Sequence, residues 1–580
     1  MRRTRFNFFG VAMLKNDRDV ISHIATYIPT EGIQAHLDSQ HVPAETVPFD
    51  DVFASVRSFV RPKLQSLSPR IVDSAARNIE DDIIAELSEH FAQTLLAEFT
   101  ARRPAGVMLL ARLSDSIDVL DRTLYRQFVR SLWDGGLALL LQTYPVLARI
   151  LSLIVAAKLD EAAEFVERLD SDWPALRDSF ALTSSRVVTI RGSLSDRHNG
   201  LRTVKVVTFA SGQSVVYKPK GTGLQVAWSA LLDWANQRSD LDLKTLATVD
   251  RTTHGWVEFI RDTACADDSA VERFYRRAGA LVCLSYAIRG SDCHFENVIA
   301  SGEYPVLIDT ETLMQPVVEI GGEVLSSGSP DFLMRHLRHC VMQSGMLPTW
   351  EPISETHAVN PSAFARMDSS SITKPEWCYM NSDYIYYGEP RRVTFSNSNF
   401  LRIGSHAVDA TNYMDHIIRG FEEAYRLLLV HRDELLAESG PLALFRHQTT
   451  RFVLRNTRLY RMLIEHSLQP EHLKSEASFR SYFEGLIRQL PAQTYRWNPQ
   501  IVWNAELAAL TSLDIPMFTC GADSRTLHTE RDTRIEGAIC KSGYQAVRSV
   551  MQSLSEEDLR RQIALIRMSL RAPHAHEQQV

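Results

Sequence analysis

The spacing of apolar positions predicts helices in the first third of the chain. Apolar residues recur every three or four positions from Ile79 to Phe99, which places them on one helical face. A stretch rich in Leu and Ala, residues 134–158, has the same period. We therefore expect residues 1–180 to form a packed helical region, and no motif within it points to chemistry.

The pattern changes to that of short strands after Arg186. Strands are predicted at residues 187–190, 203–209 and 215–218, with a polar loop at 192–200 between the first two. Pro219 ends the third strand directly after Lys218. Protein kinases place their phosphate-covering loop and their phosphate-binding lysine in this order.

The order of the following elements is also that of a two-lobed kinase. A helix near 224–237, a buried strand at 255–260 and a helix at 271–288 precede a polar loop, and strands at 298–300 and 305–308 follow it. Beyond residue 330 we expect loops at 354–375 and 389–398, and helices at 413–437, 457–490, 503–513 and 556–570. The tail from Arg571 is expected to be disordered.

The polar loop carries the residues with the clearest chemistry. Asp292 and Asn297 lie five residues apart, and Asp309 follows twelve residues later at the end of an apolar run. A phosphotransferase needs one carboxylate for the acceptor hydroxyl, and an amide and a carboxylate for magnesium. With Lys218 to neutralise phosphate charge, the pattern predicts a phosphotransferase that uses ATP and Mg²⁺.

Other residues near this loop are candidates for further roles. Glu311 is a candidate second carboxylate near the metal, and His294 either contacts a phosphate or stabilises the loop. The backbone of Glu258 and Phe259 lies where a kinase hinge would hold adenine. A kinase also pairs its lysine with a glutamate; none occurs between residues 218 and 250, so Asp233 is the nearest helical substitute.

Composition narrows the class of protein. A chain of 580 residues predicts two to four domains, and a net charge of −7 gives no reason to expect binding to nucleic acid. The seven cysteines are dispersed and form no CxxC pair, which disfavours a disulfide framework or a zinc site and favours the reducing cytoplasm. No segment approaches the length of an apolar membrane span.

Nine short motifs carry a more specific signal, and their order matches one family. They resemble the dehydratase domain of class II lanthipeptide synthetases (LanM type) over about residues 180–570. The motifs are SDRHNGLR at 195–202, YKPK at 217–220, GWVEFI at 255–260, YRR at 275–277, RGSDCHFEN at 289–297, LIDTET at 307–312, SGMLP at 344–348, RFVLRNT at 451–457 and DIPMF at 514–518.

The resemblance implies an α+β fold, with a lipid-kinase-like two-lobed catalytic core, a helical N-terminal region and additional C-terminal helices. On this basis residues 1–180 are the helical region, and residues 181–330 are the kinase-like core with its phosphate loop. Residues 331–570 are the C-terminal part of the dehydratase with the elimination residues, and residues 571–580 are a disordered tail.

The resemblance also implies a two-step reaction on a ribosomally made precursor peptide with a leader. ATP phosphorylates Ser and Thr, and the same site then eliminates phosphate to leave dehydroalanine or dehydrobutyrine. Residues carried over for phosphorylation are Lys218, Asp292, His294, Asn297, Asp309 and Glu311, with His198 and Arg202 on the nucleotide.

For elimination, the resemblance implies Arg451 and Thr457, with Ser344 where the family usually has Thr. Because Arg451 and Thr457 are six residues apart, they do not share a helical face. The segment must therefore bend, or begin a helix near Thr457.

Two departures from the family pattern keep alternatives open. Leu201-Arg202 stands where the family usually has Gly-Arg. The chain also ends where the family's zinc-dependent cyclase domain would begin, so cyclisation is expected to be absent or supplied by a separate cyclase. The alternatives are a peptide or protein kinase that does not eliminate, and a catalytically inactive leader-binding module; the retained phosphotransferase residues argue against the second.

Overall fold

The computed structural model describes most of the chain. The described residues are 18–39, 46–104, 106–107, 121–318, 340–349, 351–352, 358–364, 372–393, 400–489 and 499–571. The predicted disordered tail, except Arg571, and half of each of the loops expected at 354–375 and 389–398 lie outside these residues.

The N-terminal third is helical, as its apolar period predicts. Two long helices dominate it, α4 (Asp73–Arg102) and α8 (Pro145–Ser179). Pro145 begins α8, where a residue without an N–H costs the helix no hydrogen bond. Shorter helices surround the pair: α1 (Arg18–Ala25), α2 (Glu31–Asp38), α3 (Ala54–Gln65), α6 (Thr123–Ser131) and α7 (Leu137–Thr143).

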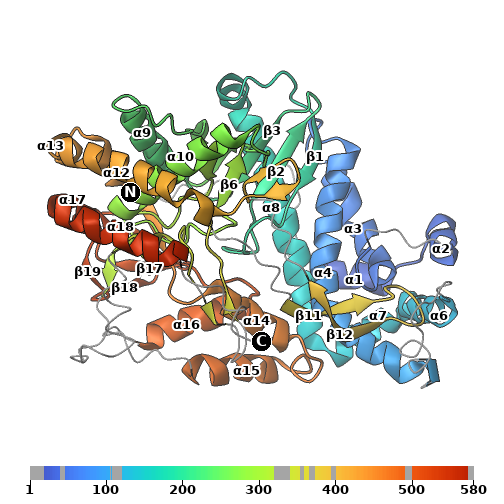
Figure 1. Cartoon of the computed structure of the whole chain (residues 1–580). Coiled ribbons are helices and arrows are strands. Elements are labelled where there is room, and N and C mark those ends of the chain that lie inside the picture. The colour runs from blue at the N-terminus through green and yellow to red at the C-terminus, as the bar shows by residue number, and fades with distance from the viewer. Residues whose placement is uncertain are drawn as a thin grey trace, which may run out of the picture.

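A five-stranded antiparallel sheet packs against these helices (Figure 1). Its spatial order is β1-β2-β3-β5-β4, and this confirms the predicted meander. The strands are β1 (Val187–Arg191), β2 (Lys205–Phe209), β3 (Ser214–Lys218), β4 (Thr248–Asp250) and β5 (Gly255–Glu258).

The two faces of this sheet have different surroundings, because alternate side chains of a strand point to opposite faces. Tyr217 and Trp256 pack on Phe165 of α8, with ring centroids 5.1 and 5.9 Å from it. The alternate residues Val216 and Lys218 line a cavity on the other face. The helical region thus packs against one face of the strand that carries Lys218, and the cavity lies on the other face.

A second core forms around a buried helix, α10 (Asp268–Ala287). The N-cap residue Asp267 accepts a hydrogen bond from the Ala270 amide at 2.8 Å. The polar loop follows the end of α10, and the hairpin β6 (Val298–Ser301) and β7 (Tyr304–Leu307) follows the loop, as predicted. Around α10 pack α9 (Gly223–Asn236), α12 (Met414–Val430), α13 (Arg432–Leu436), α17 (Gly543–Ser553) and α18 (Glu556–Arg571).

The C-terminal part adds a four-stranded antiparallel sheet that the sequence did not predict. Its strands are β15 (Thr449–Phe452), β16 (Phe518–Gly521), β17 (Leu527–Thr529) and β18 (Arg534–Ile535). Helices α14 (Thr457–Ser467), α15 (Glu476–Gln489) and α16 (Pro499–Leu510) lie between β15 and β16 in the chain. The prediction of loops is wrong for 372–375 and 389–393, which belong to the paired strands β11 (Ile372–Cys378) and β12 (Tyr386–Val393).

In the part of the chain that the structure describes, no single helix has the length and apolar composition of a membrane span. The segments Thr123–Thr143 and Pro145–Ser179, which meet at a bend of 108°, reach that length and composition only as a pair.

We predict that Gly420→Ala destabilises the fold by about 3 kcal/mol, because α10 and α12 cross with their backbones in contact. A Cβ at Gly420 would lie 1.7 Å from the Arg276 carbonyl oxygen, so the helices must separate. The control is Gly485→Ala in α15, where a Cβ meets nothing within 4 Å. This change should raise the free energy of unfolding by about 0.5–1 kcal/mol, because alanine has a higher helix propensity than glycine. Equal denaturant midpoints for the two variants would contradict the prediction.

Candidate functional site

A cavity of about 1820 Å³ opens between the five-stranded sheet, the polar loop and the start of α14. It brings together almost all of the residues that the sequence singled out, and Ser344 and Asp233 are the exceptions. Those that line it are His198, Arg202, Lys218, Glu258, Phe259, Asp292, His294, Asn297, Asp309, Glu311, Arg451 and Thr457.

Lys218 lies at the end of β3, where it meets the residue that follows β7. Its Nζ donates to the Ile308 carbonyl at 2.6 Å and lies 3.6 Å from Asp309 Oδ1. Burial lowers the pKa of Lys218, and the charge of Asp309 opposes this shift. The expected substitute partner, Asp233, is exposed on α9, so that expectation is wrong: the carboxylate beside the lysine is Asp309.

Lys220 is a second lysine of the site that sequence reasoning missed. Its Nζ lies 3.6 Å from Asp309 Oδ1 and is ion-paired with Glu311. Burial acts to lower the pKa of Lys220, but Asp309 and Glu311 outweigh it and the pKa is raised. Its place in the YKPK motif, two residues after Lys218, was the available signal.

The polar loop is held in shape by its own residues. Asp292 has a left-handed φ of 58°, which is uncommon for a residue with a side chain. Asn297 Nδ2 donates to the Asp292 carbonyl at 2.7 Å, and the Asn297 carbonyl accepts from the Ile308 amide at 2.9 Å. The amide nitrogen of Asn297 therefore faces the loop, which leaves its oxygen as the candidate metal ligand.

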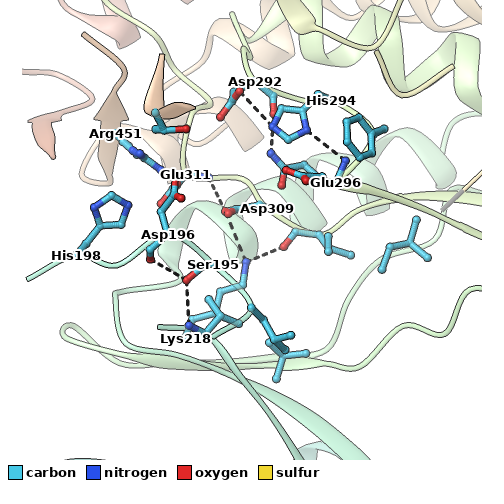
Figure 2. Close-up of a pocket in the computed structure, with 18 of the residues that line it drawn as sticks. Ser195, Asp196, His198, Lys218, Asp292, His294, Glu296, Asp309, Glu311 and Arg451 are labelled. Carbon is cyan, nitrogen blue, oxygen red and sulfur yellow. Dashed lines mark hydrogen bonds and ion pairs between the residues drawn. The ribbon is translucent and has the colours of Figure 1, made fainter. Parts of the chain in front are cut away.

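His294 acts on Asp292 within this loop. Its Nδ1 accepts from the Glu296 amide at 3.2 Å, so in the neutral ring the proton is on Nε2, 3.4 Å from Asp292 Oδ1 (Figure 2). Burial raises the pKa of Asp292, and the charges of His294 and Arg451 oppose the shift. The Asp292 side chain is still 42% exposed, to the cavity that it lines. Of the two roles left open for His294, this geometry favours stabilising the loop.

Arg451 reaches the same site from a distant part of the sequence. Its amide donates to the Glu311 carbonyl and its Nη1 to Glu311 Oε1, both at 2.7 Å. The Arg451 carbonyl accepts from Gln315 Nε2 at 2.7 Å, which fixes β15 against the loop after β7. Burial acts to raise the pKa of Glu311, but Lys220 and Arg451 hold it well below its ordinary value.

Thr457 is the first residue of α14, and this confirms that the segment begins a helix there. The N-cap residue Asn456 accepts from the Arg458 amide at 2.9 Å. The turn between β15 and α14 thus brings both Arg451 and Thr457 to the cavity wall.

The structure does not place Ser344 in the cavity. Its side chain is fully buried, donates to the Val341 carbonyl at 2.8 Å and accepts from the Met346 amide at 3.2 Å. Its own carbonyl accepts from the Cys293 amide at 2.8 Å. Ser344 therefore supports the polar loop from behind and has no side-chain atom for chemistry.

The loop between β1 and β2 differs from a kinase phosphate loop. Asn199, Gly200 and Leu201 are all left-handed, with φ of 52°, 84° and 62°. The amides of Gly200 and Leu201 donate to the two carboxylate oxygens of Asp514, each at 2.8 Å. These amides are therefore bound by a carboxylate of the protein, and the side chains of the loop face the cavity in their place.

Two of those side chains were predicted to bind the nucleotide. Arg202 Nε donates to Glu164 at 2.8 Å. Figure 2 shows His198 beside Arg451. Burial, and then the charge of Arg451, lower the pKa of His198 to about 4, so the ring is neutral near pH 7.

The predicted hinge is only partly available. The Glu258 amide donates to the Ala247 carbonyl at 2.9 Å, and its carboxylate accepts from Lys244 Nζ at 2.8 Å. Phe259 lines the cavity with its ring 5.9 Å from the Arg191 guanidinium. The backbone amide of Glu258 already donates to the Ala247 carbonyl. The adenine of a nucleotide would therefore contact Phe259 and the residues after it.

The donor set fits the magnesium of a nucleotide. Asn297 and Asp309 supply hard oxygens, and Mg²⁺ is commonly held by one or two carboxylates together with substrate phosphates. Across the described ranges, no group of three or more His, Cys, Asp or Glu residues forms an all-protein metal site. Lys218 and Lys220 lie where phosphate charge would need to be neutralised.

Comparison with known proteins gives a family match and a related protein. A family model described as a domain of unknown function (DUF4135) matches residues 144–521. The lacticin 481/lactococcin biosynthesis protein LcnDR2 of Lactococcus lactis subsp. lactis is 23% identical over 453 residues, which are 74% of this chain and 46% of that protein. The chain thus spans about half the length of this curated relative.

We predict that Glu530→Gln raises the melting temperature at pH 8 by about 2 °C and changes it little at pH 5. Burial, and then the Asp514 carboxylate, raise the pKa of Glu530 from 4.5 to about 7. Because the folded protein holds this proton more tightly than the unfolded chain, the stability that it contributes is lost as pH rises from 4.5 through 7. The exposed Glu536 provides the control, Glu536→Gln, which should show no such difference.

Proposed function

We propose a function for this chain from one premise, that it belongs to the DUF4135 family. The proposed function is that of a peptide dehydratase of the lanthipeptide type. Such an enzyme phosphorylates Ser and Thr of a ribosomally made precursor peptide with ATP and Mg²⁺ and then eliminates the phosphate. One observation carries the proposal: Arg451 is bonded to Glu311 at 2.7 Å, inside the cavity that also holds Lys218, Asp292 and Asp309. A phosphate installed there lies within reach of a rigid cationic fork.

The first step uses the residues around the polar loop. MgATP, when bound, supplies the phosphoryl group and part of the cation charge. Asn297 and Asp309 would hold the metal, and Lys218 and Lys220 would neutralise phosphate oxygens. Asp292 would orient the acceptor hydroxyl and take its proton, because burial raises its pKa and its carboxylate reaches the cavity.

The second step breaks two bonds of the phosphorylated residue. A base takes the α-proton, its electron pair forms the double bond, and phosphate leaves with the electrons of the C–O bond. We propose His198 as this base, because it lines the cavity, its ring is neutral, and its buried Nε2 has no hydrogen-bond partner among the described residues. Arg451 and the first turn of α14 at Thr457 would stabilise the leaving phosphate.

The comparisons support the substrate class. LcnDR2 is by its name a biosynthesis protein of lacticin 481 and lactococcin, and this chain matches it over 453 residues. We therefore propose a precursor peptide with a leader as the partner, and a lipid-kinase-like core as the fold that carries the cavity. A kinase that does not eliminate remains the competing function, because phosphorylation needs neither Arg451 nor His198.

The test is mass spectrometry of a candidate Ser/Thr-rich precursor peptide with its leader, after incubation with the chain, ATP and Mg²⁺. We expect loss of water from wild type, and neither phosphate nor water loss from Asp309→Asn, which removes a metal ligand and the counter-charge of Lys218. The control is Asp242→Asn, since Asp242 lies outside the cavity lining and pairs with Arg277 at 2.8 Å. A stable phosphopeptide from wild type would favour the kinase, and an unmodified peptide would reject both functions.

For Arg451→Ala we expect phosphorylated peptide to accumulate, with dehydration slowed about 100-fold. Phosphorylation should persist because Glu311 keeps Lys220 as its partner. Arg451→Lys keeps the charge but loses the two-pronged guanidinium group, so its dehydration rate should lie between those of wild type and Arg451→Ala. Arg446→Ala removes an exposed arginine paired with Asp523 and should match wild type. Fully dehydrated peptide from Arg451→Ala would show that the elimination role is wrong.

A further inference from the structure

The segment Asp514–Ile515 holds the loop over the cavity at four points. Both Asp514 oxygens accept loop amides, those of Gly200 and Leu201, at 2.8 Å. The Ile515 amide donates to the Arg197 carbonyl at 2.9 Å, and the Ile515 carbonyl lies 2.8 Å from His198 Nδ1. Two consecutive residues thus fix the loop backbone and one of its side chains together.

The contact with His198 decides which of its nitrogens carries the proton. A carbonyl oxygen only accepts hydrogen bonds, so Nδ1 must be the protonated nitrogen of the neutral ring. Nε2 then carries the lone pair, and this buried atom has no hydrogen-bond partner in the described part of the chain. Without the Ile515 contact, the proton could reside on either nitrogen and the ring could rotate.

Asp514 can hold the loop backbone from outside the cavity. Asp514 is only 5% exposed, and it does not line the cavity. Each of its two oxygens takes one amide, so an isosteric asparagine would satisfy one amide and set its NH₂ group against the other.

We propose that Asp514 and the Ile515 carbonyl form a positioning element, which holds the loop at residues 197–202 in its left-handed conformation and sets the tautomer of His198. The inference rests on the proposed function for its effect on the reaction, because it makes His198 competent for elimination. Its structural half, the clamp on the loop, stands on the contacts alone. Asp514 acts through the loop and does not contact substrate.

The variant is Asp514→Asn, and the matched control is Asp172→Asn. Asp172 is also 5% exposed, and it accepts hydrogen bonds from Trp256 Nε1 at 2.9 Å and Arg251 Nε at 2.9 Å, outside the cavity. Both variants should lose stability, because each replaces one of the two accepting oxygens of a buried carboxylate with an NH₂ group. A difference between them in the loop or in the products therefore reports positioning and not folding.

The first measurement is hydrogen–deuterium exchange of the intact chain, well below the melting temperatures of all three proteins. We expect Asp514→Asn to speed exchange in the segment 197–202 by about tenfold or more, and Asp172→Asn to leave it at the wild-type rate. Wild-type exchange of this segment in Asp514→Asn, or equal acceleration in both variants, would overturn the clamp.

The second measurement is the ratio of phosphorylated to dehydrated precursor peptide. We expect Asp514→Asn to raise this ratio at least about tenfold and Asp172→Asn to leave it unchanged, because a base displaced by about 1 Å loses much of its efficiency. If wild type dehydrates and Asp514→Asn gives the same ratio, the link to His198 is wrong and the proposed function stands. If wild type does not modify the peptide, the proposed function fails, and exchange alone decides on the clamp.

Discussion

Glu311 forms ion pairs with Lys220 and Arg451 at once, and the rest of the site depends on this arrangement. The side chains of Glu311 and Arg451 are 16% and 10% exposed, so little water is available to replace this contact, whereas Lys220 is 32% exposed. Removing one partner of a buried pair costs far more than the pair contributes, because the charge left behind is uncompensated. Three segments that are far apart in sequence, the end of β3, the loop after β7 and β15, are therefore held at one point.

The charges in the part of the cavity around Asp309 and Glu311 balance before any substrate enters. Three carboxylates, of Asp292, Asp309 and Glu311, face three cations, of Lys218, Lys220 and Arg451. A nucleotide brings several negative charges into this balanced set, so it needs a cation of its own. This fits a site in which magnesium arrives with the nucleotide, and it agrees with the few protein oxygens available to hold a metal.

The sequence predicted the elements with a clear period and the motifs tied to them. The meander, the buried helix before the polar loop and the convergence of Lys218 with Asp309 all follow from alternation, capping and motif spacing. In irregular segments the sequence does not predict which side chains are buried or where they point. The Ser344 side chain, for example, donates to the Val341 carbonyl within a turn, and no pattern in the neighbouring residues predicts this. The strands of the second sheet span two to four residues, too few to show alternation.

The β11–β12 hairpin was missed because prolines are poor strand residues, yet Pro375 and Pro390 lie opposite each other beside a bulge.

The departure at Leu201 follows from the same contacts. A left-handed residue with a side chain costs about 1–2 kcal/mol, which is why such loops favour glycine. Here the Leu201 side chain is 1% exposed, and its amide is bonded to the Asp514 carboxylate. A hydrogen bond to a charged group contributes about 1.5–3 kcal/mol, enough to offset the strain. The loop thus keeps its shape without the glycine, and because its amides are bound, what it offers the cavity is side-chain chemistry.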